Sequence, residues 1–377
     1  MTGKERWLYF DLGAQDVYQA NGRMPKLVRR VHDGGQPLMT TAVWGDTHLD
    51  MGWFDDVDVW VDLEACRRLG VEVIRRPLYG GGTAFYDNGC ACMWSWMLPK
   101  ATHPDLDTES ARFKPIMEDV LVRLGLQDVM FEGSMDLRWN GRKLGAMPGQ
   151  DVVLCNTVGG FINLKRPNLD LYLQVGRVPE DKFRDKLVKD MREYVVSADE
   201  IRGRPLSYQE FAATLVAACR DAGMDLEPAT ENLEVSAEKV RARIASDEHL
   251  RRISSARFRA QAPELSRVGF ANHKGRKLCR AGVAIDVDGT IVAAMMAGDM
   301  HVSPPDVIDR VADALVGADG ADAGELRRRI GAVFDDDSVH QSNTVLGVTT
   351  DDLLAAVTGA VAQAMAAEPQ HAGAMDQ

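Results

Sequence analysis

The stretch RRPLYGGGTAFYDNG, from Arg75 to Gly89, says the most about the fold of this chain. Three consecutive glycines follow two arginines and precede a short β-like run, Thr83–Tyr86. Glycine backbone can approach a ligand closely because it has no Cβ, and arginine supplies positive charge. The combination predicts a loop that binds an anion.

The glycines are expected to join two strands. Val71–Ile74 and Thr83–Tyr86 on either side of them are β-like runs. A Walker loop and a dinucleotide fingerprint both need glycines that open a helix, and a Walker loop also needs Gly-Lys-Ser/Thr. Both of these nucleotide loops are therefore poor fits. The turn Asp87-Asn88-Gly89 predicts a hairpin between Thr83–Tyr86 and a long strand, Cys90–Leu98.

A second hairpin is predicted in MDLRWNGRKLGAM, Met135–Met147, around Asn140-Gly141. A two-residue turn pairs Arg138 with Lys143, and strand alternation places Asp136 on the same face as these two. An acid and a lysine on one face of a hairpin can form a site or a solvated cross-strand ion pair. Spacing alone favours the ion pair and leaves both interpretations open.

Other segments have clear periodicity, and a polar stretch near 227–234 marks a domain boundary. A third hairpin is predicted to turn at Asp288-Gly289, and Ser207 with Glu210 gives a capping-box pattern. The remaining expectations are sheet over Asp151–Leu164 and helices over 179–195, 207–222, 234–252, 305–315, 323–334 and 350–366.

The bulk composition excludes several classes of protein. The chain has 377 residues and a net charge of −12, which argues against nucleic acid or an anionic membrane surface as a partner. No run reaches the roughly 18 apolar residues of a membrane span, and the charged N-terminus does not read as a signal peptide. Six cysteines in so long a chain form no disulfide framework. A reduced, cytoplasmic protein is expected.

Taken in order, these motifs resemble the lipoate–protein ligases of the biotin/lipoate ligase superfamily. The resemblance rests on the arginine–glycine stretch, on Met135-Asp136 followed by Gly141-Arg142-Lys143-Leu144-Gly145, and on GDMHVSPPDVIDRVADALVG near the C-terminus. It covers most of the chain. The sequence departs from the family pattern at Tyr86, where histidine is usual, and at Met135, where asparagine is usual. It also has one extra residue between the arginines and the glycines, and Gly145-Ala146-Met147-Pro148 in place of Ser-Gly-Ser-Ala.

The resemblance implies an α+β fold. A mixed β-sheet catalytic domain of biotin/lipoate-ligase type would span residues 1–225, followed by a helical linker over 226–260. A smaller α+β C-terminal accessory domain would span 261–366, with a disordered tail over 367–377.

The resemblance also implies an ATP-dependent ligase that activates lipoate as an acyl-adenylate and transfers it to a lysine of a lipoyl-carrier protein domain. Lys143 would be catalytic, and Asp136 would hold Mg²⁺ or orient Lys143. One of the two arginines would face the phosphate, with Arg76 preferred. The residues expected to bind ATP or the adenylate are Arg75, Arg76, Gly80, Gly81, Gly82, Thr83 and Asp136.

Several alternatives stay open. The same fold could join a different acid to a small-molecule amine, or could bind an acyl carrier without catalysis. Cys155 could act as the nucleophile of an octanoyl transferase that uses no ATP, although a structural cysteine is favoured. Trp94 and Trp96 continue the alternation of Cys90 and Cys92 and so share a face with them. Both tryptophans are expected in the core, with one tryptophan in an acyl pocket as the alternative.

Overall fold

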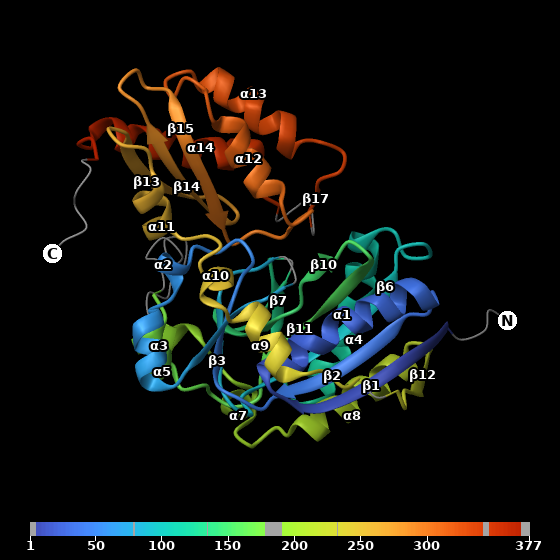
Figure 1. Ribbon diagram of the computed structural model, residues 1–377. Helices are drawn as coiled ribbons and strands as arrows, with labels where there is room; N and C mark the ends of the chain where they lie inside the picture. Colours follow the sequence, from blue (N-terminus) through green and yellow to red (C-terminus); the bar gives the residue numbers. More distant parts are fainter. Residues whose placement is uncertain are drawn as a thin grey trace.

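A computed structural model of the chain describes residues 5–77, 80–133, 135–177, 191–231, 233–341 and 347–370. Figure 1 shows two units, a larger one in blue to yellow and a smaller one in orange to red above it. Each unit has a sheet with helices packed on it, so the predicted α+β class with a smaller C-terminal unit is confirmed. No helix among these residues is long and apolar enough to cross a membrane.

The larger unit is built on a mixed sheet, in which nine strands are described in the order β12-β1-β2-β6-β11-β9-β8-β7, with β10 beside β11. The pairs β12–β1 and β1–β2 are parallel, and the other neighbours are antiparallel. The strands are β1 (Glu5–Gln15), β2 (Leu38–Trp44), β6 (Ala91–Pro99), β7 (Met130–Glu132), β8 (Asp136–Trp139), β9 (Arg142–Ala146), β10 (Gly149–Asp151), β11 (Cys155–Asn163) and β12 (Met224–Pro228).

Helices cover both faces of this sheet. On one face, α4 (Leu106–Arg123) and α8 (Tyr208–Asp221) pack on the core that contains Trp94 and Trp96, whose ring stacks 4.4 Å from that of Phe113. Both tryptophans are therefore core residues, as expected. On the other face, α1 (Val17–Gly34) packs over Cys155, which is fully buried.

A small second sheet has the order β4-β3-β5, made of β3 (His48–Met51), β4 (Glu72–Arg75) and β5 (Ala84–Tyr86). The glycine loop joins β4 to β5, as predicted. The hairpin predicted between β5 and β6 is wrong, because β5 pairs with β3 and β6 belongs to the large sheet. The turn at Asp87-Asn88-Gly89 instead carries the chain from one sheet to the other.

The remaining helices of the larger unit and of the connecting segment are short. Ser207 caps α8 by accepting from the Glu210 N–H. The helix expected over 234–252 is divided in two, since Ser246 caps a new helix, and most of the helix expected over 179–195 lies outside the described residues. These helices are α2 (Val57–Trp60), α3 (Leu63–Leu69), α5 (Leu169–Val175), α6 (Met191–Tyr194), α7 (Ala198–Arg202), α9 (Ala237–Ile244), α10 (Asp247–Leu250) and α11 (Ser255–Gln261).

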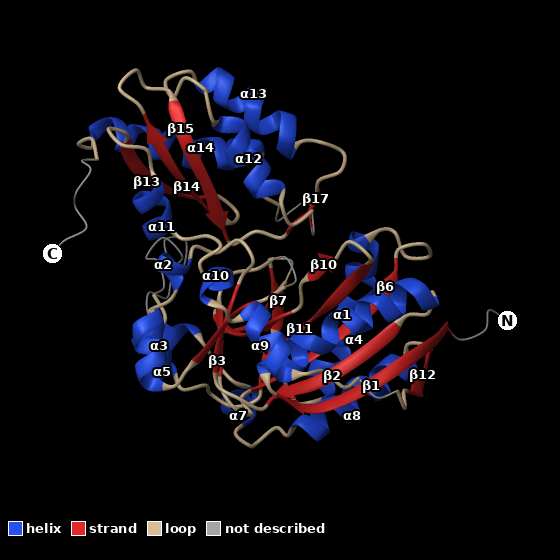
Figure 2. Cartoon of the chain, in the orientation of Figure 1, coloured by secondary structure: helices blue, strands red, loops and turns tan. Residues whose placement is uncertain are grey.

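The smaller unit is a three-stranded antiparallel sheet with helices on one face (Figure 2). The predicted hairpin at Asp288-Gly289 and all three predicted helices are present. Gln370 exchanges backbone hydrogen bonds with Leu265 and Ser266, and residues 371–377 of the predicted tail lie outside the described residues. The elements are β13 (Arg267–Lys274), β14 (Leu278–Ile285), β15 (Ile291–Gly298), β16 (Val302–Ser303), β17 (His340–Gln341), α12 (Val307–Leu315), α13 (Ala323–Phe334) and α14 (Thr350–Ala366).

Candidate active site

A cavity of about 820 Å³ lies where the two units meet. The glycine loop, the β8–β9 hairpin and strand β11 line it from the larger unit. The β13–β14 turn and the segment after β15 line it from the smaller unit. Lys143, Asp136, Arg76, Thr83 and Gly80–Gly82 all line this cavity, so the fold gathers nearly all of the predicted site residues in one place.

The β8–β9 hairpin presents Lys143 to the cavity. Asn140 and Gly141 have φ values of 49° and 75°, the left-handed pair that a tight hairpin turn needs. The register pairs Arg138 with Lys143, as predicted. Lys143 Nζ lies 2.7 Å from Asp136 Oδ1, and Arg138 lies 2.6 Å from Asp136 Oδ2.

The neighbouring charges determine the protonation states of Asp136 and Lys143. Burial disfavours the carboxylate of Asp136, but Lys143 and Arg138 outweigh it and lower the pKa of Asp136 to about 2. Burial likewise disfavours the ammonium of Lys143, but Asp136 and Tyr194 raise its pKa above the ordinary value. Both groups are charged at neutral pH. Lys143 is therefore a fixed positive charge, with no role as a base.

The glycine loop is held in shape by Arg76. The guanidinium of Arg76 donates to the carbonyl oxygens of Gly80 and Gly82, at 2.7 Å and 2.9 Å, and pairs with Asp50 at 3.3 Å. Gly80 has a φ of 120°, which strongly favours glycine. The N–H of Gly81 donates to Met300 O in the smaller unit at 3.0 Å, so this donor is already occupied.

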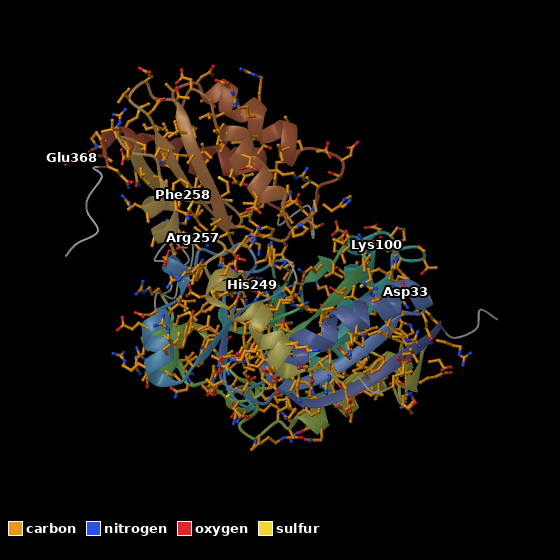
Figure 3. All side chains as sticks on the ribbon, viewed as in Figure 1. Asp33, Lys100, His249, Arg257, Phe258 and Glu368 are labelled. Atoms are coloured by element: carbon orange, nitrogen blue, oxygen red, sulfur yellow. The ribbon has the colours of Figure 1, made fainter. Side chains whose placement is uncertain are left out.

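Arg75 does not line the cavity. This position corrects the expectation that Arg75 binds ATP. Its side chain is fully buried, and within the described part of the chain the guanidinium donates to backbone carbonyl oxygens. Its partners include Gly52, Asp55 and Leu250, at 3.0, 2.7 and 2.6 Å. Strand alternation turns Arg75 and Arg76 to opposite sides of β4. Arg75 therefore ties the small sheet to the connecting segment, on which Figure 3 shows His249, Arg257 and Phe258 in succession.

The loop after β3 supports the glycine loop, a contact that no local sequence pattern indicates. Asp55 accepts from the Thr83 hydroxyl at 2.7 Å, so Thr83 is turned toward this support. A Cβ on Gly52 would lie 2.1 Å from Gly81 O, so the two backbones are in direct contact. The contact joins segments that are distant in sequence, and local patterns carry no information about it.

One wall of the cavity is aromatic and apolar. Tyr86 lies 5.2 Å from Trp44 and 5.4 Å from Phe161, measured between ring centroids, and Met93 lines the same region. Burial, followed by the nearby Asp50, raises the pKa of Tyr86, so its hydroxyl stays neutral. A cavity that is lined by this apolar wall and also by cations suits a molecule with an apolar chain and an anionic head.

Asp136 is poorly placed to bind a metal through the protein alone. Its two oxygens face Lys143 and Arg138, and no group of three His, Cys, Asp or Glu converges anywhere in the described ranges. Mg²⁺ is often held mainly by substrate phosphates. Of the two roles expected for Asp136, the geometry favours orienting Lys143.

The cysteines offer no nucleophile. Cys155 is buried under α1, does not line the cavity, and burial raises the pKa of its thiol to about 12. A thiol that is buried and protonated is inert. The alternative of a cysteine-dependent octanoyl transferase at Cys155 therefore has no support in the geometry.

Comparison with solved structures gives the fold independently. P. falciparum LipL1 in complex with lipoate matches with a TM-score of 0.65 at 12% identity, over 93% of this chain and 99% of that one. The bipartite lipoate protein ligase of Thermoplasma acidophilum, from a study with its E2 lipoyl domain, matches with a TM-score of 0.52 at 21% identity, over 66% and 96%. A lipoate-protein ligase A bound with ATP matches with a TM-score of 0.50 at 18% identity, over 66% and 98%.

A search of curated proteins found no match. A family model, however, matches residues 18–220, which is more than half of the chain and includes the glycine loop, Lys143 and Asp136. The match agrees with the order of motifs and with the geometry of the cavity. The chain belongs to the family of the lipoyl protein ligase A/B catalytic domain.

Proposed function

We propose that this protein is an ATP-dependent lipoate–protein ligase that forms an acyl-adenylate and transfers the acyl group to a lysine of a lipoyl-carrier domain. The observation that carries the proposal is the position of Lys143. It is a partly buried ammonium, charged at neutral pH and held by Asp136, in a cavity with one apolar wall and a glycine loop.

The first half-reaction joins two anions, and the site supplies the positive charge that offsets their repulsion. The carboxylate of the acid attacks the α-phosphorus of ATP, and pyrophosphate leaves. Lys143 can contact both the acid's oxygen and the α-phosphate, so it offsets their repulsion and stabilises the charge of the transition state. Asp136 keeps Lys143 protonated and in position, and Mg²⁺ would enter bound to the phosphates of ATP.

The apolar wall supports a carboxylic acid with an aliphatic body as the substrate. Trp44, Tyr86 and Phe161 would pack against its chain, and its carboxylate would point toward Lys143. The solved lipoate ligases of similar fold include one in complex with lipoate and one studied with an E2 lipoyl domain. We take lipoate as the acid and a lipoyl domain as the acceptor for these reasons.

Acid-dependent ATP–pyrophosphate exchange tests the proposal, with lipoate, octanoate, biotin and no acid as the four arms. Lipoate should support exchange, and Lys143→Ala should lower it by a factor on the order of 100 or more. Lys239→Ala, which removes an exposed lysine of α9, is the matched control and should exchange normally.

Two results would contradict the proposal. Normal exchange by a folded Lys143→Ala variant would remove Lys143 from the chemistry. Exchange that depends on another acid and not on lipoate would keep the adenylation chemistry and replace the substrate, in favour of a ligase that acts on a different acid.

A further inference from the structure

Beside Gly80, two buried nitrogen atoms have no hydrogen-bond partner among the residues that the structure describes. They are Nδ1 of His301, in the smaller unit, and Nε2 of Gln150, on β10 of the larger unit. Both lie next to Gly80, because a Cβ on that residue would be 2.8 Å from the first atom and 3.2 Å from the second. Buried polar groups are normally satisfied, so this convergence indicates a ligand between the two units.

The surroundings of these atoms favour an anion. Burial, followed by Lys277, lowers the pKa of His301 to about 3, and Arg76 and Lys143 act in the same direction. Cations from both units therefore lie around a neutral imidazole. Asp299 is the acidic residue on this side, and it lies against Gly82.

Most of these cations are already paired with acids, but one is not. Lys143 pairs with Asp136, and Arg76 pairs with Asp50. Lys277, in the β13–β14 turn, has no salt bridge with any of the described residues, although it lines the cavity. Lys277 therefore adds a positive charge from the smaller unit to the lining of the cavity.

We propose that Lys277, His301 and Gln150 form a subsite for the β- and γ-phosphoryl groups of ATP, so that the smaller unit binds the leaving group of the first half-reaction. This inference rests on the proposed function. In the step it assists, a carboxylate oxygen forms a bond to the α-phosphorus, and the bond from that phosphorus to the bridging oxygen breaks. The electron pair leaves on pyrophosphate, and no proton moves.

The subsite would act only in the first half-reaction. Lys277 neutralises charge that grows on the departing pyrophosphate, while Gln150 and the neutral His301 each offer an N–H to a phosphate oxygen. Transfer of the acyl group from the adenylate to an amine involves no pyrophosphate. Lys277 and His301 are therefore positioning residues for ATP and should be dispensable for the transfer.

The test compares the binding of ATP with that of AMP by calorimetry, without any acid present. Lys277→Gln and His301→Ala should each weaken ATP binding by about tenfold or more, the usual value of a charge-assisted contact, and leave AMP binding unchanged. Lys277→Arg should retain most of the affinity for ATP, and Lys239→Gln is the control. Transfer from presynthesised lipoyl-adenylate to a lipoyl domain should proceed at the wild-type rate in both variants.

Unchanged ATP affinity in Lys277→Gln would overturn the subsite, as would a parallel loss of ATP and AMP binding. A transfer rate that falls with ATP affinity would also overturn it, because the residues would then support the site as a whole. The binding comparison needs no acid. If wild-type protein shows no exchange with lipoate, the proposed function fails. The ATP and AMP affinities would still show whether the subsite binds the β- and γ-phosphoryl groups.

Discussion

At the scale of single residues, the central feature is the pairing of Lys143 with Asp136. Sequence spacing alone favoured a solvated cross-strand ion pair, and the ion pair is indeed present. The surroundings of this ion pair distinguish it from a solvated surface pair. Both side chains are 27% exposed and line a cavity, and Lys143 keeps its charge in spite of burial. Desolvation makes such a charge more effective toward a bound anion than one in water.

We predict that Asp136→Asn will change the pH dependence of exchange. Asp136 is the largest influence that raises the pKa of Lys143, and burial, which lowers that pKa, would remain in the variant. The ammonium would then lose its proton at a lower pH. The exchange rate of Asp136→Asn should therefore begin to fall at lower pH than that of the wild type, when rates are measured from neutral to alkaline pH.

Asp128→Asn, at an exposed position of the larger unit, is the control and should keep the wild-type profile. An alkaline limb at the same pH in Asp136→Asn and in the wild type would show that Asp136 does not control the protonation of Lys143.

At the scale of elements, the glycine loop depends on two neighbours. Arg76 holds it through the carbonyl oxygens of Gly80 and Gly82, and the loop after β3 supports it from behind. The loop is therefore a fixed surface, which suits a site that must place two anions together. The Gly80–Gly82 run was visible in the sequence, but its support at Gly52 was not.

We predict that Gly52→Ala will displace the loop and lower the exchange rate by a factor on the order of 100, as a shift of about 1 Å at a reacting centre can do. The reason is that a Cβ at residue 52 would lie 2.1 Å from Gly81 O, a backbone atom that cannot rotate away. Exchange kinetics at saturating lipoate and far-UV circular dichroism would separate displacement from unfolding.

The matched control is Gly45→Ala, because its nearest neighbour would be at an ordinary 3.4 Å. A wild-type exchange rate in a folded Gly52→Ala variant would show that the position of the glycine loop does not control the reaction of ATP.

At the scale of the whole molecule, a buried ion pair joins the two units. Arg280 of β14 lies 3.0 Å from Asp56, which caps α2 in the larger unit and is 1% exposed. Trp53 adds a hydrogen bond from its indole N–H to Pro305 O at 2.9 Å. The cavity lies between the units that these contacts hold together, so their arrangement determines its shape.

We predict that Arg280→Ala will lower the free energy of unfolding by about 3–5 kcal/mol, because it leaves the carboxylate of Asp56 buried without its cation. Urea unfolding would measure the loss, and limited proteolysis would show whether the segment between the units becomes accessible. Arg327→Ala removes an arginine from an exposed pair with Asp351 and should change stability little. Equal stability of the two variants would show that Asp56 does not need Arg280.

Features that depend on neighbours in the chain could be predicted from the sequence alone. The Asn140-Gly141 hairpin, the hairpin at Asp288-Gly289 and helices such as Ala323–Phe334 follow from turn chemistry and periodicity, which act over a few residues. The same local rule placed Lys143 and Asp136 on one face. The order of such motifs was sufficient to indicate the family.

Features that depend on partners from distant parts of the chain could be established only from the assembled fold. Strand β5 joined β3 rather than β6, and Arg75 turned to backbone carbonyl oxygens while Arg76 turned to the cavity. His301 reached the glycine loop, and Lys277 the same cavity, only because the smaller unit packs over the larger one. Local propensity cannot specify such pairings, since burial and hydrogen bonding in the assembled fold select among strands and side chains that are locally equivalent.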